Sequence, residues 1–188
     1  MPGEVTFEGH ITFVLGGARS GKTRHGLALC EALHAEHGLT PVYIATAQAF
    51  DSEMEERIAL HKAERGPAWR TVEAPGSKPG DLTGAIRRES TDHTCLLVDC
   101  LTLWLTNLML GGDTIDLDAA RQELVAALGE AKGPVVIISN EVGLGIVPEN
   151  ALARRFRDEA GRINQTVAAA ADRVVLVAAG LPLTLKGP

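Results

Sequence analysis

An eight-residue run near the start of the chain carries the clearest chemistry: Gly-Gly-Ala-Arg-Ser-Gly-Lys-Thr at positions 16–23. It has the Gly-x-x-x-x-Gly-Lys-Thr spacing of a P-loop, with an apolar strand-like run before it and a helix-favouring stretch after it. Backbone N–H groups of such a turn, and the positive end of the next helix, bind phosphate oxygens. Lys22 would reach the β- and γ-phosphates, and the Thr23 hydroxyl would bind Mg²⁺. The run therefore predicts a nucleoside triphosphate site.

A carboxylate in a fitting place is Asp99, which ends the apolar run 95–98. In P-loop proteins a carboxylate at the end of such a strand holds Mg²⁺ directly or through water, and so neutralises charge on the transferring phosphoryl group. The alternative is an aspartate that caps the helix expected from Leu101. The two roles are compatible, and we favour the metal role because the P-loop supplies the other half of such a site.

His61 has two interpretations from the residues alone. Met54, Ile58 and His61 are spaced to share one helix face, so the plainer interpretation of His61 is a residue at the edge of a packed face. The functional alternative is a nucleophile: a neutral imidazole can attack the α-phosphorus of a triphosphate, expel pyrophosphate and hold the nucleotidyl group as a phosphoramidate. His25 is interpreted as an ordinary helix residue.

Other polar residues keep two interpretations each. Arg19 and Arg24 could pair with phosphate oxygens, although Arg24 fits a solvated first-turn position equally well. Glu73 could accept hydrogen bonds from a guanine edge or a ribose, or simply face solvent at the end of its strand. Residues 140–145, Asn-Glu-Val-Gly-Leu-Gly, could form a substrate loop or a plain connection between a strand and a helix.

Alternating strand and helix signals must position these residues. Strands are predicted over 11–15, 41–46, 69–73, 95–99, 134–139 and 173–179, with 183–185 as a candidate edge strand. Helices are predicted over 22–35, 51–65, 81–89, 101–110, 117–131 and 149–172. The pattern predicts an α/β fold with a mostly parallel central sheet and helices on both faces. Ligands of such sheets bind at the carboxyl ends of the strands, so residues 16–23, Thr46, Asp99 and Asn140-Glu141 should converge.

Composition sets the outer bounds. The chain has 188 residues, 45% of them hydrophobic, and a net charge of −6. This predicts a single domain over 1–188, with no role assigned to 1–10, and excludes broad binding to nucleic acid or anionic membranes. Cys30, Cys95 and Cys100 lack zinc-site spacing and are interpreted as reduced thiols. No apolar stretch is long enough for a membrane span, and residues 1–10 lack the apolar core of a signal peptide, so we expect a cytoplasmic protein.

These motifs together resemble a known family. Residues 13–25 look like the N-terminal signature of the bifunctional adenosylcobinamide kinase / adenosylcobinamide-phosphate guanylyltransferase of vitamin B12 biosynthesis. Similar segments recur in order along the chain: 43–48, 51–62, 69–73, 101–108, 139–150 and 156–165. A P-loop alone is shared by many families, whereas this ordered set is far more specific.

The resemblance implies two reactions on one RecA-like P-loop domain. The enzyme would phosphorylate the aminopropanol hydroxyl of adenosylcobinamide from ATP or GTP with Mg²⁺. It would then transfer GMP from GTP to that phosphate through a guanylyl-histidine, giving adenosyl-GDP-cobinamide and pyrophosphate. The resemblance places the guanylylated histidine at His61, and it implies a homo-oligomer, typically a trimer. It carries the nucleotide contacts over to Gly16, Gly17, Ala18, Arg19, Ser20, Gly21, Lys22, Thr23, Ala45, Thr46, Ala47, Lys62, Ala63, Glu64, Arg65, Glu73 and Asp99.

Two other functions were weighed. A P-loop kinase of another small alcohol would use the same phosphate site, with His61 merely structural; covalent labelling by GTP separates the two. A GTP-switched binding module is disfavoured because the chain has no Asn-Lys-x-Asp segment, and because Asp99 is followed by Cys-Leu-Thr rather than by the spacing Asp-x-x-Gly. For the corrinoid acceptor, we expect contacts near residues 140–148 and at a subunit boundary.

Overall fold

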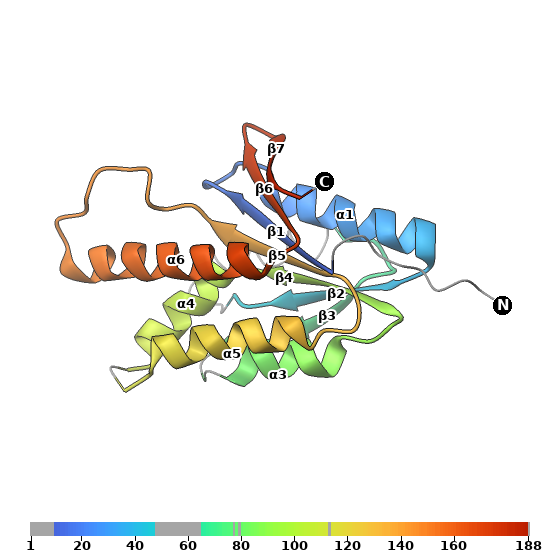
Figure 1. Ribbon diagram of the computed structural model, residues 1–188, viewed down its shortest axis with the longest axis horizontal. Helices are drawn as coiled ribbons and strands as arrows, with labels where there is room; N and C mark the ends of the chain where they lie inside the picture. Colours follow the sequence, from blue (N-terminus) through green and yellow to red (C-terminus); the bar gives the residue numbers. More distant parts are fainter. Residues whose placement is uncertain (1–9, 48–64, 77, 79, 113, 188) are drawn as a thin grey trace.

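Seven strands form one sheet in the order β3–β2–β4–β5–β1–β6–β7 (Figure 1). The computed structural model describes residues 10–47, 65–76, 78, 80–112 and 114–187. Strands β1 to β6 are mutually parallel, and β7 runs antiparallel to β6 at one edge. The strands are β1 Ile11–Gly16, β2 Thr40–Ala45, β3 Arg70–Glu73, β4 Thr94–Asp99, β5 Val135–Asn140, β6 Arg173–Ala178 and β7 Leu181–Lys186.

Helices cover both faces of this sheet (Figure 1). They are α1 Lys22–His37, α3 Gly80–Glu89, α4 Leu101–Leu110, α5 Leu117–Gly129 and α6 Ala151–Ala170. Alternate residues of each central strand enter opposite cores, as the pleat requires. Phe13 and Ile44 pack in the core under α3 to α6, whereas Val14 and Tyr43 pack in the core under α1. Both faces are therefore buried, which explains the continuous apolar runs of the strands.

The predicted fold class is confirmed, and the element bounds differ only at their ends. The candidate edge strand is present and longer, over Leu181–Lys186. Helix α6 begins two residues later than predicted because Asn150 is its N-cap, accepting a hydrogen bond of 3.0 Å from Ala153 N. Helix α1 extends to His37, where Gly38 ends it in a left-handed conformation at φ 71°. The helix predicted over 51–65 lies almost wholly outside the described residues.

The three cysteines are buried, and they form no disulfide with one another. None of the helices in the described part of the chain is long and apolar enough to cross a membrane.

Candidate nucleotide-binding site

The P-loop connects the carboxyl end of β1 to the first turn of α1. Gly21 supplies the left-handed backbone of the turn at φ 95°, and Arg19 also lies in the left-handed region at φ 55°. For Arg19 this conformation is strained, because its Cβ crowds the following carbonyl. A hydrogen bond of 3.2 Å from Ser20 N to Gly17 O closes the loop. The turn thus has the conformation that turns successive N–H groups inward.

Gly16 shows why this loop needs a glycine at its base. A Cβ added there would stand 2.3 Å from Ser20 Oγ and 2.6 Å from Val177 O, closer than packed atoms allow. A Cβ at Gly17 would meet nothing within 4 Å. Ser20 Oγ is buried and has no hydrogen-bond partner among the described residues. A buried hydroxyl without a partner at the base of the loop suits a polar ligand.

Lys22 lies at the start of α1 and is 9% exposed. Its ammonium donates a hydrogen bond of 2.9 Å to Gly17 O, which holds the charge over the loop. Burial lowers the pKa of Lys22 below its ordinary value, and the nearby Asp99 carboxylate opposes part of that shift. An ammonium held over a glycine-rich loop is placed to contact a phosphate.

Asp99 lies opposite the P-loop at the end of β4. Its Oδ2 accepts hydrogen bonds of 3.2 Å from Thr23 Oγ1 and 2.8 Å from the Tyr43 hydroxyl. The helix after β4 is capped by Cys100, with no side-chain capping bond, so the interpretation of Asp99 as the cap is wrong. The Thr23 hydroxyl and an Asp99 carboxylate oxygen therefore lie side by side next to the P-loop.

A buried network fixes the backbone behind Asp99. Thr46 Oγ1 accepts a hydrogen bond of 2.7 Å from Cys100 N and donates one of 2.8 Å to Cys100 O. The buried amide of Asn107 donates 2.9 Å to Thr46 O and also bonds Pro75 O. Burial and the Asp99 charge raise the pKa of the Cys100 thiol to about 11, so it stays protonated at neutral pH. Sequence reasoning gave Asn107 no structural role; an amide in a mostly apolar helix was the available signal.

Asn140 and Glu141 lie on the other side of the P-loop. Asn140 pairs with Gly16 across β5 and β1, and Glu141 N donates 3.1 Å to Gly16 O. The Thr102 hydroxyl accepts from Asn140 N at 3.0 Å and from Asn140 Nδ2 at 2.9 Å. The predicted convergence of 16–23, Thr46, Asp99 and Asn140-Glu141 at one edge of the sheet is therefore observed.

The remaining predicted contacts fall into two groups. Ala45 ends β2, and Thr46 and Ala47 follow it at the same end of the sheet. Glu73 ends β3 in register with Ala45. Arg65 is described and stacks its guanidinium carbon 3.7 Å from the centroid of the Tyr43 ring. The other predicted site residues lie outside the described residues: His61, Lys62, Ala63 and Glu64.

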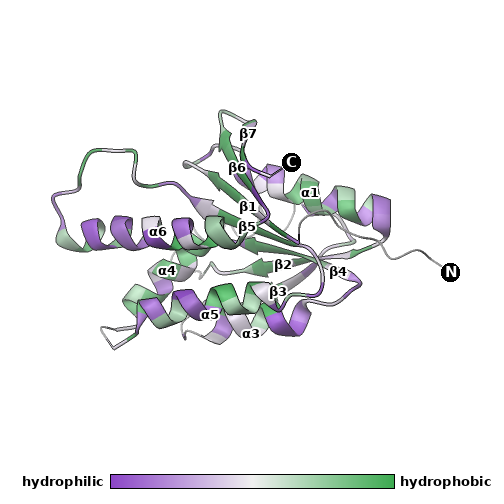
Figure 2. Ribbon diagram, in the orientation of Figure 1, coloured by the Kyte–Doolittle hydropathy of each residue, from purple (hydrophilic) through white to green (hydrophobic). Residues whose placement is uncertain are grey.

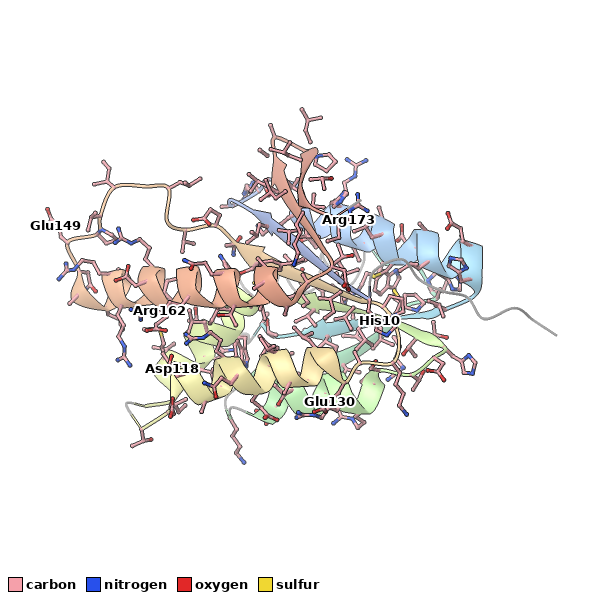
Figure 3. The ribbon with its side chains drawn as sticks, viewed as in Figure 1. His10, Asp118, Glu130, Glu149, Arg162 and Arg173 are labelled. Atoms are coloured by element: carbon pink, nitrogen blue, oxygen red, sulfur yellow. The ribbon has the colours of Figure 1, made fainter. Side chains whose placement is uncertain are left out.

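Residues 141–150, which we call the β5–α6 segment, loop out beyond the strand ends (Figure 1). Figure 2 shows a hydrophobic stretch along this segment, beside the polar outer face of α6. Leu144 is 88% exposed, Ile146 96% and Val147 58%. Figure 3 shows Glu149 at its outer end beside the start of α6, away from Arg173 at the start of β6. An apolar surface this exposed usually marks a binding face.

Comparisons with known proteins agree with the family resemblance that the motifs indicated. Residues 12–185 match the family model described as cobinamide kinase / cobinamide phosphate guanyltransferase. The chain is 52% identical to the bifunctional adenosylcobalamin biosynthesis protein CobP of Pseudomonas aeruginosa, over 93% of this chain and 96% of that protein. It is 43% identical to the bifunctional adenosylcobalamin biosynthesis protein CobU of Salmonella typhimurium, over 94% of this chain and 99% of that protein.

Two solved structures share the fold at low sequence identity. The flagellar accessory protein FlaH from Methanocaldococcus jannaschii superposes with a TM-score of 0.54 and 13% identity, covering 95% of this chain and 78% of that chain. A KaiC-like protein from Pyrococcus horikoshii gives a TM-score of 0.52 and 14% identity, and the match covers 89% of this chain and 70% of that chain. Both support the P-loop, RecA-like assignment of the fold.

Proposed function

Because this chain belongs to the cobinamide kinase / cobinamide phosphate guanyltransferase family of cobalamin biosynthesis, we propose that a single nucleotide site at residues 16–23 and Asp99 serves both of its reactions. The observation that carries the proposal is the convergence of Lys22, Thr23 and Asp99 at one edge of the sheet. Residues 1–188 would act as one P-loop domain in the cytoplasm.

In the kinase reaction the acceptor hydroxyl attacks the γ-phosphorus of a nucleoside triphosphate, and the nucleoside diphosphate leaves. The P-loop N–H groups and Lys22 would neutralise charge that spreads over the equatorial oxygens of the phosphoryl group. Arg19, within the loop, could add a second cation. The role of these residues is to hold the phosphates in line with the acceptor rather than to form covalent bonds.

Mg²⁺ would bind between Thr23 and Asp99. The Thr23 hydroxyl lies 3.2 Å from Asp99 Oδ2, so the hydroxyl oxygen and the second carboxylate oxygen, Oδ1, are close enough to bind one ion. A hydroxyl and a carboxylate are ligands that Mg²⁺ takes together with phosphate and water. No group of three or more His, Cys, Asp or Glu side chains in the described ranges is arranged to hold a metal by itself. This fits a cation that depends on the nucleotide for its other ligands. The ion would offset phosphate charge.

The guanylyl transfer would use His61 as covalent carrier. Its imidazole nitrogen attacks the α-phosphorus of GTP, a P–N bond forms, and pyrophosphate leaves. The phosphate of adenosylcobinamide phosphate then attacks the same phosphorus, and the P–N bond breaks to release the histidine. Lys62, Ala63, Glu64 and Arg65 would contact the nucleotide from the same stretch of chain, and Glu73 at the end of β3 would bind the guanine or ribose.

The deciding experiment uses GTP labelled at the α-phosphate, with Mg²⁺ and without corrinoid. We expect wild-type protein to retain label that survives alkali but not acid, the stability of a phosphoramidate. His61→Ala should retain none, whereas His93→Ala, an exposed histidine before β4, should label like wild type. Absence of label on wild-type protein that still binds GTP would favour a P-loop kinase of another small alcohol.

The corrinoid acceptor would lie over the β5–α6 segment. This segment begins at the P-loop, where Glu141 N bonds Gly16 O, and it presents Leu144 and Ile146 to solvent. A large, partly apolar acceptor could pack there while its alcohol reaches the γ-phosphate. Leu144→Cys offers a test, because bound cobinamide should protect the new thiol from alkylation. Equal alkylation rates with and without saturating cobinamide would place the acceptor elsewhere.

A homo-oligomer, a trimer by family resemblance, remains part of the proposal. The edge strand β7 supports it: Leu181, Leu183 and Leu185 alternate along the strand and are 72%, 59% and 56% exposed. An exposed apolar edge strand is a natural place for pairing between copies. Light scattering on the purified chain measures the assembly directly, and a monomer at all concentrations would contradict it.

A further inference from the structure

Tyr43 connects two parts of the proposed nucleotide site that are remote in sequence. It lies on β2, is 5% exposed, and has Leu97 and Thr71 as its register partners on β4 and β3. Because β2 is the second strand from the β3 edge of the sheet, Tyr43 has β3 on one side and β4 on the other. It is also the only tyrosine of the chain.

The Tyr43 hydroxyl contacts the Asp99 carboxylate, which is proposed to bind Mg²⁺. It donates 2.8 Å to Asp99 Oδ2, the same oxygen that accepts from Thr23. Within the described residues no protein donor reaches Oδ1 of Asp99. With one oxygen held by two donors, the carboxylate keeps a single orientation and its second oxygen remains for water or a cation.

The ring holds the end of the segment that follows His61 in sequence. The Arg65 guanidinium carbon lies 3.7 Å from the ring centroid, a cation–π stacking distance, and Arg65 Nη2 donates 3.3 Å to Thr71 Oγ1. Trp69 meets the same ring edge-to-face, with centroids 6.3 Å apart. The guanidinium is thereby fixed over β2 and β3.

We propose that Tyr43 is a positioning residue with two separable duties: its hydroxyl orients Asp99 toward magnesium, and its ring supports Arg65 for guanylyl transfer. This rests on the proposed function, since both partners are assigned to the nucleotide site there. Tyr43 can contact both groups because β2 lies between two strands: β4, which carries Asp99, and β3, against which Arg65 packs. One side chain therefore links the groups of the two reactions.

The hydroxyl duty is tested by the affinity for a non-hydrolysable GTP analogue, measured by calorimetry with and without Mg²⁺. Tyr43→Phe keeps the ring and removes the donor, so the gain in affinity that Mg²⁺ gives should fall about tenfold. Affinity without Mg²⁺ should stay within about twofold of wild type. Trp69→Phe, which changes the other neighbour of the ring, should behave like wild type in both conditions.

Two results would overturn this part of the proposal. An unchanged Mg²⁺ gain in Tyr43→Phe would show that the hydroxyl does not orient the carboxylate. An equal loss of affinity with and without Mg²⁺ would show a general structural role instead. Circular dichroism of each variant establishes that the comparison is between folded proteins.

The ring duty is tested by the rate at which α-labelled GTP guanylylates the protein at saturating Mg²⁺. Tyr43→Phe should label at nearly the wild-type rate, and Tyr43→Leu, which lacks the ring, about tenfold more slowly. Equal rates in the two variants would overturn the ring duty. If wild-type protein takes no label, the proposed function fails, whereas the Mg²⁺ measurement still decides the hydroxyl duty by itself.

Discussion

The P-loop site and the β5–α6 segment both begin at the carboxyl ends of the parallel strands, but they differ in how far their side chains are buried. Lys22 and Thr46 are buried, and backbone hydrogen bonds connect the loop to the residues that follow β5 and β6. The β5–α6 segment presents bare apolar side chains, with Leu144 and Ile146 almost fully exposed. Phosphate needs fixed donors shielded from water, whereas a large acceptor needs an open surface. The contrast predicts that changes in each region affect different substrates.

The largest effect is expected at Lys22. In Lys22→Ala the kinase kcat/KM should fall about 10²–10³-fold, because a preorganised cation is lost from the transferring phosphate. Lys132→Ala, an exposed lysine before β5, is the matched control and should keep wild-type activity. Measuring cobinamide phosphorylation and corrinoid affinity together sharpens the comparison, since only the first should change. A loss of corrinoid affinity would break the separation of the two regions.

Next in size is a pair of glycine substitutions in the loop. Gly16→Ala must displace Ser20 or Val177, and should lower the free energy of unfolding by about 1–3 kcal/mol and weaken GTP binding. Gly17→Ala meets open space in the protein and should change stability by less than about 0.5 kcal/mol. Urea unfolding with and without GTP gives both quantities. Equal stability of the two variants would contradict the packing argument for Gly16.

A smaller effect is expected on the β5–α6 segment. The double substitution Leu144→Ser and Ile146→Ser should raise the KM for the corrinoid about tenfold, because exposed apolar area available to the acceptor is lost. The Kd for GTP should not change. Leu110→Ser, which alters another leucine at 65% exposure, is the control. A matching rise in the Kd for GTP would show that the segment belongs to the nucleotide site.

The smallest expected effect concerns how slowly the three buried cysteines are alkylated in the native protein compared with the unfolded protein. With a pKa of about 11 and 5% exposure, Cys100 should resist iodoacetamide at pH 8, and the buried Cys30 and Cys95 should resist it too. Its thiolate fraction should rise only as pH approaches 11, because burial favours the neutral thiol. Mass spectrometry of native and unfolded protein reads the labels. Rapid alkylation of Cys100 in native protein would mean that the network behind Asp99 opens.

Local patterns made most of the fold and half of the site predictable. The P-loop could be located because its glycines, lysine and threonine act within eight consecutive residues. The strands could be located because burial on both faces leaves long apolar runs. The start of α6 was predicted two residues early, at 149, because the capping role of Asn150 was not recognised in the sequence.

Tyr43 shows what such patterns miss. In the sequence it is one polar aromatic between Val42 and Ile44, and nothing local pairs it with a carboxylate 56 residues away. A hydroxyl within the apolar run 41–45 was the only signal. His61 was assigned through resemblance, because helix spacing alone favoured a packing residue.

By itself, the sequence determined the kind of ligand and the class of fold. Phosphate binding depends on residues that are adjacent in the chain, and buried strands are recognised from runs of apolar residues. Only the tertiary structure decided which groups meet: Asp99 with Thr23 and Tyr43, and Tyr43 with Arg65. The reason is physical. Parallel strands that pair in space are separated along the chain by whole helices, so strand order, which no local pattern encodes, chooses the neighbours of every side chain at the sheet edge.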